Sequence, residues 1–306
     1  MKSLVRTLLA ALAALQIAAA SAADTIRIAA QKTGTFAWEL AIIRAHGLDK
    51  EANLALEVRE LASPEAGKIA LRSLGAKLAF YPYSTALGAV MVPDKSPIRT
   101  LADLKGRKLA VAGGPIDKSW LLLQASLQQD GINLKSDSTI VYGAAPLVAA
   151  QMLNGDMDAT VNYWNYCAAL EEKGFRRIAA IQDLVEHFGA KGPVAMVGYV
   201  FDEGWANANR DRLARFIDMT RQAKQILATS DSAWDEIAKL TGAPDAATLR
   251  AYRDRYREGI PRRRIEDEEK DARVLYRVLA GIGGRDLVGP APELDPGTFY
   301  HALPGD

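Results

Sequence analysis

Hydrophobic and polar residues follow two periods in turn along the first two thirds of the chain. Residues 25–30 and 54–61 alternate as β-strands do, whereas residues 36–47 repeat apolar positions at helical spacing and end on a glycine. The same succession returns later, with strands expected at residues 108–112, 138–142 and 158–163 and a helix behind each. Strands that alternate with helices predict an α/β fold with parallel sheets covered by helices.

From Asn209 onward the chain is predicted to be almost entirely helical. Residues 210–228 carry an apolar stripe that suits docking on a core, formed by Leu213, Phe216, Ile217, Thr220, Ala223 and Ile226. A charge run at residues 262–273 follows Pro261. We interpret it as a solvated helix start rather than a docking surface, because acidic residues complement the positive end of a helix dipole.

The chain begins with the features of a secretory signal peptide. Lys2 and Arg6 precede an apolar run, and the small residues at 20–22 suit cleavage near Ala22. The run is shorter than the roughly 20 apolar residues of a membrane span. The sole cysteine, Cys167, excludes a disulfide framework and a lipid anchor behind the leader. We therefore expect a periplasmic protein that diffuses freely.

Length and charge narrow the class of partner only slightly. The formal net charge is +1 over 306 residues. A balance so close to neutral indicates no polyanion-binding surface, so no nucleic-acid partner is expected. The length suits one large or two modest domains with proper cores.

Residues 108–124 share features with a nucleotide-binding phosphate loop but fail its pattern. Aligned on Lys118 and Ser119, the loop needs glycine at positions 112 and 117, where this chain has Ala112 and Asp117. The stretch still joins a strand to a helix start through two glycines, which suits anion binding. We predict Lys118, Ser119 and Trp120 as ligand contacts. The alternative is an ordinary capped helix start with Trp120 in the core.

Three further stretches follow predicted strands, where ligands of open α/β sheets bind. They are residues 31–38, 81–85 and 162–166, and their threonines, amides and aromatic rings suit recognition of a small solute. The predicted contacts are Thr33, Thr35, Phe36 and Trp38, then Tyr83, Ser84 and Thr85, then Asn162, Trp164 and Asn165. In the alternative interpretation Thr35 caps a helix, Trp38 lies in the core, and Pro82 makes a rigid turn.

The residues that could carry catalysis are scattered. Cys167 lies in no recognisable nucleophile motif, and His46, His187 and His301 are far apart in sequence. We interpret Cys167 as a small buried hydrophobe. No metal-binding motif is present. We therefore predict no catalytic residue, metal ligand or cofactor.

The chain resembles the solute-binding proteins of ABC importers, in the nitrate, sulfonate and taurine type that includes thiamine-pyrimidine-precursor-like domains. The resemblance rests on residues 26–58, 92–114, 153–164 and 293–303, and the segment SPIRTLADLKGRKLAV at 96–111 is its most specific part. It implies a two-lobe, type II periplasmic-binding-protein-like α/β fold with two crossover strands and a helical C-terminal part.

Mapped onto this sequence, the resemblance places the crossovers near residues 86–92 and 194–200. Lobe one then holds residues 23–90 and 201–306, and lobe two holds residues 91–200. It further implies a monomer that binds a small organic or anionic solute between the lobes and delivers it, after hinge closure, to an ABC permease in the inner membrane. Two alternatives stay open: an accessory interaction protein with a degenerate cleft, and an enzyme on the same scaffold.

The chain departs from the family pattern in lobe one. Residues 68–81 and 148–163 resemble each other, because each runs from an apolar helix through a glycine turn into a strand. Similar proteins usually place a further strand and helix after the first such turn, marked by an aspartate. Here Leu78 takes the place that corresponds to Asp158, and the chain enters a strand directly. One β–α unit of lobe one is therefore missing or rebuilt.

Overall fold

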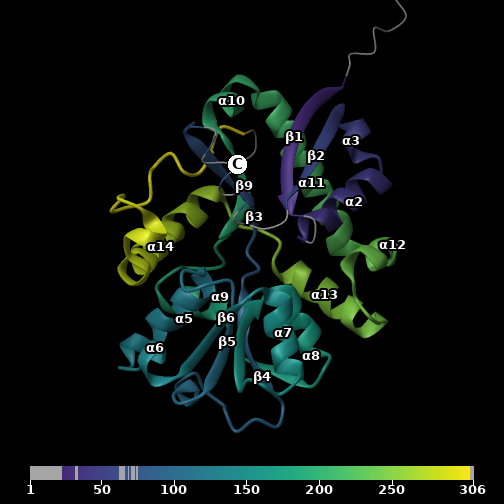
Figure 1. Ribbon diagram of the computed structural model, residues 1–306. Coiled ribbons are helices and arrows are strands. Elements are labelled where there is room, and N and C mark those ends of the chain that lie inside the picture. Colours follow the sequence, from purple (N-terminus) through teal and green to yellow (C-terminus); the bar gives the residue numbers. More distant parts are fainter. Residues whose placement is uncertain are drawn as a thin grey trace, which may run out of the picture.

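Two α/β lobes lie one above the other, and the strand pair β3 (Leu78–Ser84) and β9 (Val197–Asp202) lies near the centre of the molecule (Figure 1). This computed structural model describes residues 23–31, 34–61, 66, 67, 69, 73 and 75–303. The predicted leader and the predicted contact Thr33 lie outside the described residues.

The first lobe begins with two parallel strands, β1 (Asp24–Gln31) and β2 (Leu54–Leu61), in which Asp24 lies opposite Leu54. Helices α2 (Phe36–Ala45) and α3 (Leu48–Glu51) connect them. The predicted helix end is confirmed at Gly47, whose φ of 68° suits glycine. Four later helices complete this lobe: α10 (Glu203–Ala208), α11 (Arg210–Thr229), α12 (Ser232–Thr241) and α13 (Ala246–Glu258).

The second lobe contains a five-stranded sheet in the order β6-β5-β7-β4-β8. Its strands are β4 (Gly88–Pro93), β5 (Lys108–Ala112), β6 (Thr139–Gly143), β7 (Ala159–Tyr163) and β8 (Phe175–Ala180). Its helices are α5 (Lys118–Gln129), α6 (Leu134–Asp137), α7 (Ala145–Leu153), α8 (Trp164–Glu171) and α9 (Ile181–His187). The sequence pattern does not predict β8.

The prediction of parallel sheets is only partly correct. Strand β5 is parallel to β6 and β7, but β4 is antiparallel to both of its neighbours, and β3 is antiparallel to β9. The reason is topological, because β4 and β9 are the strands by which the chain enters the second lobe and re-enters the first. They run against the strands that a helix connects.

Each lobe has its own hydrophobic core. The apolar stripe predicted on α11 is confirmed, since Leu213, Phe216 and Ile217 are buried in the first core. The last helix, α14 (Ile265–Val288), contributes Leu275 and Leu279 to the second core. Among the helices of the described ranges, none is both long and apolar enough to cross a bilayer.

The sheet of the first lobe is divided into two separate pairs, β1–β2 and β3–β9. The chain passes from β3 to β4 through residues 85–87, so residues 75–93 contain no further helix. Helix α11 bridges the pairs, because Arg212 forms an ion pair with Asp24 of β1 (Nη2 to Oδ1, 2.8 Å) and Arg221 donates to the hydroxyl of Tyr81 in β3. Side chains of α11 therefore link the two strand pairs.

The C-terminal segment lies along the free edge of β3. The Phe80 amide donates to the Thr298 carbonyl (2.7 Å), the Tyr300 amide donates to the Phe80 carbonyl (3.0 Å), and the Phe80 and Phe299 rings meet at 5.2 Å. Phe299 is 5% exposed. This segment therefore pairs with β3 as an additional short strand would.

The α13–α14 connection, residues 259–264, contacts both segments by which the chain crosses between the lobes. We call residues 85–87, between β3 and β4, the first crossing, and the segment just before β9 the second crossing. Gly259 accepts a hydrogen bond from the Thr85 amide (2.9 Å), and a Cβ at Gly259 would lie 2.5 Å from the Cβ of Ala86. Arg263 donates to the carbonyl of Pro193 (3.0 Å), just before β9. The connection therefore requires glycine where it packs on the first crossing.

We expect Phe299→Ala to lower the free energy of unfolding by about 3–5 kcal/mol, because it empties a buried aromatic site beside β3. Leu240→Ala is the control, since Leu240 is 49% exposed on α12 and its loss is expected to cost at most about 0.5 kcal/mol. Urea unfolding followed by circular dichroism measures both. Equal losses in the two variants would show that the segment does not stabilise β3.

Candidate functional site

Aromatic side chains from two of the predicted stretches meet a ring of β9. Phe36, at the start of α2, contacts the rings of Tyr83 (5.7 Å between centroids) and Tyr199 (5.6 Å), and these two lie 5.3 Å apart. Tyr83 is the penultimate residue of β3, and Tyr199 lies within β9. The edge-to-face geometry of these contacts is a favourable one for aromatic pairs.

A second set of rings joins the two lobes directly. Trp38 of α2 stacks on Tyr252 (5.6 Å), and it meets Trp164, the first residue of α8 in the second lobe, at 5.8 Å. Trp164 also lies 6.3 Å from the ring of Tyr256 on α13. We call Phe36, Trp38, Tyr83, Trp164, Tyr199 and Tyr256 the aromatic junction. The structure therefore brings together the predicted residues Trp38 and Trp164, and separately Phe36 and Tyr83.

A buried ion pair lies inside the aromatic junction. The Lys224 ammonium is 2.7 Å from a carboxylate oxygen of Glu39, which has no exposed surface, and the Tyr256 hydroxyl donates to the other oxygen (2.5 Å). Lys224 also donates to the Tyr199 hydroxyl (3.1 Å) and lies 4.3 Å from the centre of the Tyr83 ring. This carboxylate and ammonium thus have close polar partners despite their burial.

Burial sets the protonation of the groups around this pair. It raises the pKa of Tyr83, Tyr199 and Tyr256, with the negative charge of Glu39 acting in the same direction. These phenols are therefore neutral at physiological pH. Burial lowers the pKa of Lys224, while the Glu39 carboxylate opposes that shift.

The remaining predicted residues of the first lobe support the backbone. Ser84 accepts a hydrogen bond from the Ala86 amide (3.1 Å) and donates to the Gly259 carbonyl (3.3 Å). Thr85 is buried, and its amide holds the same carbonyl. Thr35 precedes α2 as its N-cap residue but makes no side-chain capping bond. Ser84 and Thr85 therefore fasten the α13–α14 connection to the first crossing.

In the loop that resembles a phosphate loop, a carboxylate of the chain itself caps the following helix. The Asp117 carboxylate accepts hydrogen bonds from the amides of Ser119 (2.9 Å) and Trp120 (3.3 Å) at the start of α5. Burial raises the pKa of Asp117. The carboxylate takes the position that a bound anion would use at this helix end.

Two of the three predicted contacts on α5 are buried. Trp120 has no exposed surface and packs in the second core, which is the alternative role set out above, and Ser119 is 3% exposed. A ligand reaches either side chain only if this end of α5 rearranges. Lys118, the first residue of α5, is half-buried, and its charge lies close to Asp117.

The end of β7 is also held by internal bonds. The Asn162 side chain is 1% exposed; its amide donates to the Ala145 carbonyl (3.1 Å), and its oxygen accepts from the Tyr163 amide (2.8 Å). Asn165 is half-buried on α8. Helices α7 and α8 begin without a side-chain cap, at Ala144 and Tyr163. The first-turn amides of α7 and α8 therefore donate to no capping side chain, whereas those of α5 donate to Asp117.

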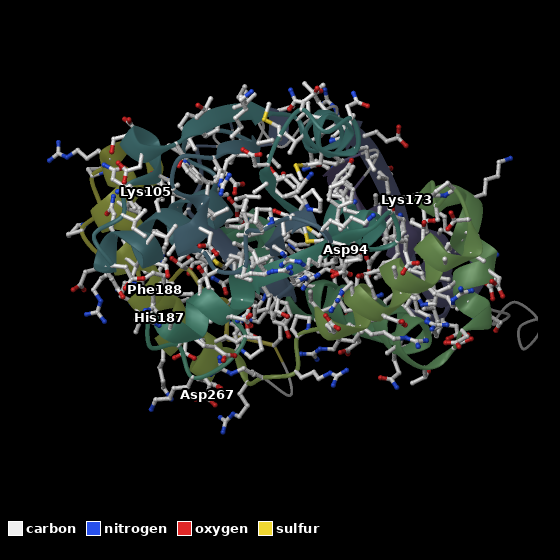
Figure 2. The ribbon with its side chains drawn as sticks, turned by 90° about the horizontal axis from the view of Figure 1, so that it is seen from below. Asp94, Lys105, Lys173, His187, Phe188 and Asp267 are labelled. Carbon is white, nitrogen blue, oxygen red and sulfur yellow. The ribbon has the colours of Figure 1, made fainter. Side chains whose placement is uncertain are left out.

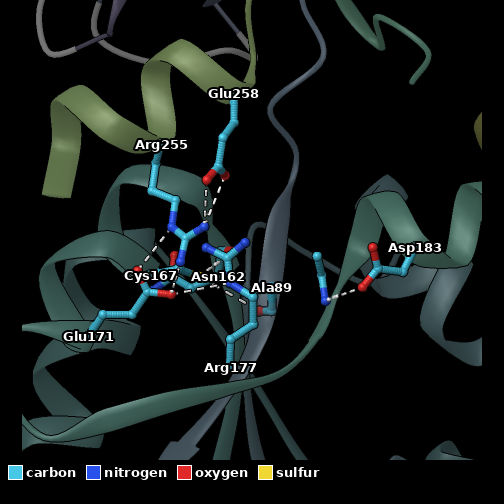
Figure 3. Close-up of polar contacts among 9 residues, drawn as sticks. Ala89, Asn162, Cys167, Glu171, Arg177, Asp183, Arg255 and Glu258 are labelled. Carbon is cyan, nitrogen blue, oxygen red and sulfur yellow. Dashed lines mark hydrogen bonds and ion pairs between the residues drawn. The ribbon is translucent and has the colours of Figure 1, made fainter. Parts of the chain in front are cut away.

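A cluster of ion pairs joins α13 to the second lobe beside the aromatic junction (Figure 3). Arg255 donates to both oxygens of Glu171 on α8 (3.1 and 2.9 Å), and it also binds Glu258 on its own helix (2.9 Å). Arg177 of β8 reaches the same Glu171 (3.3 Å). The lobes are therefore in contact through charged groups as well as rings.

Cys167, drawn with this cluster in Figure 3, has no exposed surface. Its thiol faces the carbonyls of Asn162 (3.2 Å) and Ala89 (3.7 Å). Burial raises its pKa to about 12. The group is therefore a protonated thiol at physiological pH, in keeping with its interpretation as a small buried hydrophobe.

The histidines pair with side chains at separate places. His46 contacts Glu236 (3.2 Å), His301 contacts Glu269 (2.6 Å), and His187 contacts Gln129 (2.9 Å). His187 is exposed on the outside of the second lobe, next to Phe188 (Figure 2). Within the described ranges, no group of three or more acidic, histidine or cysteine residues is placed to hold a metal ion.

A charged cavity of about 300 Å³ lies next to the aromatic junction. Strands β3 and β9, helix α11, the α13–α14 connection and the start of α14 form its walls. The cavity shares Tyr199 with the aromatic junction, and Lys224 of the buried ion pair also lines it. Sequence reasoning missed Glu39, Lys224, Tyr199 and the cavity. One signal was available, because Lys224 lies four residues after Thr220 and so falls on the predicted apolar stripe of α11.

Comparison with known proteins assigns the fold. A family model described as NMT1/THI5 like matches residues 74–231, while no curated protein sequence matches the chain. The alkanesulfonate-binding protein SsuA from Xanthomonas axonopodis pv. citri, solved bound to MOPS, is 20% identical, with 93% of this chain and 100% of that chain covered at a TM-score of 0.67.

Two further solved structures share the fold. The periplasmic aliphatic sulphonate-binding protein SsuA from Escherichia coli is 20% identical, with 88% of this chain and 95% of that chain covered at a TM-score of 0.68. The desulfurization enzyme DSZB is 16% identical, with 85% and 92% covered and a TM-score of 0.57. The predicted two-lobe, periplasmic-binding-protein-like fold is confirmed.

We expect Lys224→Met to lower the free energy of unfolding by about 3–5 kcal/mol, because it leaves the Glu39 carboxylate buried without its counter-ion. The double variant Glu39→Gln with Lys224→Met should be more stable than the sum of the single losses implies. Lys270→Met, which breaks an exposed pair with Asp267, is the control and should cost no more than about 1 kcal/mol. Additive single losses in urea unfolding would contradict the buried pair.

We expect Asp117→Ala to cost about 1 kcal/mol, since it removes the acceptor at the start of α5. Asp117→Asn keeps that acceptor and should cost less. Because burial raises the pKa of Asp117, ionisation of this group makes the wild type lose stability as the pH rises above the ordinary value of 3.8. Thermal melting between pH 3.5 and 7 should show a smaller loss in Asp117→Asn; equal pH profiles would contradict this assignment.

Proposed function

The chain belongs to the NMT1/THI5-like family, and from that premise we propose that it is the substrate-binding component of an ABC importer. It binds a small organic or anionic solute between its lobes and delivers it to a permease in the inner membrane. The predicted signal peptide supports a periplasmic location. The likeness to two sulfonate-binding proteins extends over nearly the whole chain, which supports a binding role for the same architecture.

The observation that carries the proposal is the contact between Trp38 and Trp164 across the two lobes. Both residues are predicted ligand contacts, and both belong to the aromatic junction. In the proposed mechanism the lobes separate at this contact, the solute enters between the rings, and the lobes close on it. Closure is favoured because contacts from both lobes are available only when they approach each other.

The same geometry indicates how the solute is held. Aromatic rings offer flat apolar walls with polar edges, which suit a compact organic molecule. Asp117 opposes an anionic group at α5, whereas the uncapped starts of α7 and α8 favour one. We therefore place the polar or anionic end of the solute near Ala144 and Tyr163, and its apolar part against Trp164.

One specific observation favours a second candidate function. The Arg255–Glu171 cluster joins α13 to the second lobe through charged groups. A fixed arrangement of the lobes would suit an accessory protein that binds a periplasmic partner, as would the β–α unit of lobe one that the sequence predicts to be missing or rebuilt. An enzyme of the DSZB kind is less well supported, because the protonated, buried thiol of Cys167 is a poor nucleophile.

The test is a thermal melting series of the mature protein with anions, sulfonates, amines and aromatic acids. A ligand at 100 times its dissociation constant adds about 2.7 kcal/mol of stability, which corresponds to a rise of roughly 5–10 °C. Trp164→Ala should abolish the rise. Tyr166→Ala, two residues further along α8 and so on a different face, is the matched control and should keep it. A flat response across the panel would favour the accessory protein.

A further inference from the structure

The charged cavity lies beside the crossings between the lobes and is separate from the Trp38–Trp164 contact. Tyr81 and Tyr199 line it from the strand pair, and Thr220 and Arg221 line it from α11. Arg262 lines it from the α13–α14 connection. The hydroxyl and guanidinium groups of these residues offer a compact ligand several hydrogen-bond donors at once.

Positive charge dominates the cavity lining. Five cationic side chains line it, at positions 221, 224, 262, 263 and 264, against a single acid, Glu268. Two of the cations have well-buried counter-ions: Lys224 has Glu39 at 2.7 Å, and Arg263 has Asp271 at 2.8 Å. Arg221 also pairs with Asp218, and Arg264 pairs with Glu266, in both cases through side chains that are largely exposed and so contribute little.

Arg262 differs from its neighbours. It is exposed, and the part of the chain that the structure describes provides it with no ion pair. The single acid of the lining, Glu268, is 1% exposed and already accepts a hydrogen bond from the Ala195 amide (3.0 Å). The single acid of the lining is therefore engaged by the backbone just before β9 and forms no ion pair with Arg262.

The cationic groups are held in place before any ligand arrives. Arg221 donates to the Tyr81 hydroxyl, and its guanidinium lies 5.7 Å from the centre of that ring. The connection that carries Arg262 is fixed at one end by the bond from the Thr85 amide to Gly259. Arg263 fixes it to Pro193 near the other. Such preorganisation lowers the cost of binding.

We propose that this cavity is an oxyanion-binding site, in which Arg221 and Arg262 hold a carboxylate, sulfonate or phosphate group of a compact molecule. Planar guanidinium groups match these oxyanions with paired hydrogen bonds. The volume of about 300 Å³ is at the lower end of ligand sites and excludes large molecules. An oxyanion here would link α11 of the first lobe to the connection that lies on both crossings.

The experiment titrates the mature protein with sulfate, phosphate and succinate by calorimetry, against chloride at matched ionic strength. We expect saturable binding of at least one oxyanion, weakened about tenfold or more in Arg262→Gln. Arg250→Gln is the matched control, because Arg250 is an exposed residue of α13 outside the cavity, and it should bind like the wild type. Arg262→Lys should fall between the two, since it keeps the charge but not the planar group.

The variant Trp164→Ala separates this site from the proposed solute site. It should lose the solute response of the melting panel but retain oxyanion binding. Binding that is lost in Trp164→Ala and kept in Arg262→Gln would overturn the proposal by assigning the anion to the aromatic junction. The absence of saturable binding by all three oxyanions, or wild-type affinity in Arg262→Gln, would overturn it as well. Neither result would decide whether the aromatic junction binds a solute.

Discussion

The first lobe depends on polar bridges between two strand pairs that share no backbone hydrogen bonds. In a continuous sheet, the ladder itself would fix β1 relative to β3. Here α11 performs that task with three side chains: Arg212 holds β1, Arg221 holds β3, and Lys224 holds α2 through Glu39. The buried pair is the most demanding of these bridges, because an unpaired charge in that position would cost several kcal/mol (about 3–5).

The same arrangement explains why the aromatic rings gather where they do. Phe36 at the start of α2, Tyr83 near the end of β3 and Tyr199 within β9 pack edge to face beside the buried pair. The ring faces of Tyr83 and Tyr199 and the Tyr199 hydroxyl also contact the Lys224 ammonium, which lowers the cost of burying its charge. Core packing and the candidate solute site are therefore made from the same side chains.

Much of the fold was readable from the sequence because it rests on local patterns. Strands β1 and β2 follow alternation, β5, β6 and β7 are short β-rich segments between predicted helices, and the α11 stripe follows helical spacing. Strand β8 was not readable, since Arg176 and Arg177 interrupt its apolar residues; in the fold Arg176 donates to backbone carbonyls and Arg177 pairs with Glu171. The pairing of Phe80 with residues 298–300 joins segments more than 200 residues apart, which no local pattern encodes.

Helix α13 belongs to both lobes at once. Its Tyr252 and Tyr256 pack in the first core, while Arg255 on the same helix binds Glu171 in the second lobe. A rotation of one lobe against the other moves points far from its axis most and points near the axis least. Both sets of contacts can persist during such a rotation only if its axis passes close to α13. This helix would then lie near the rotation axis, and the strands β4 and β9 would twist beside it.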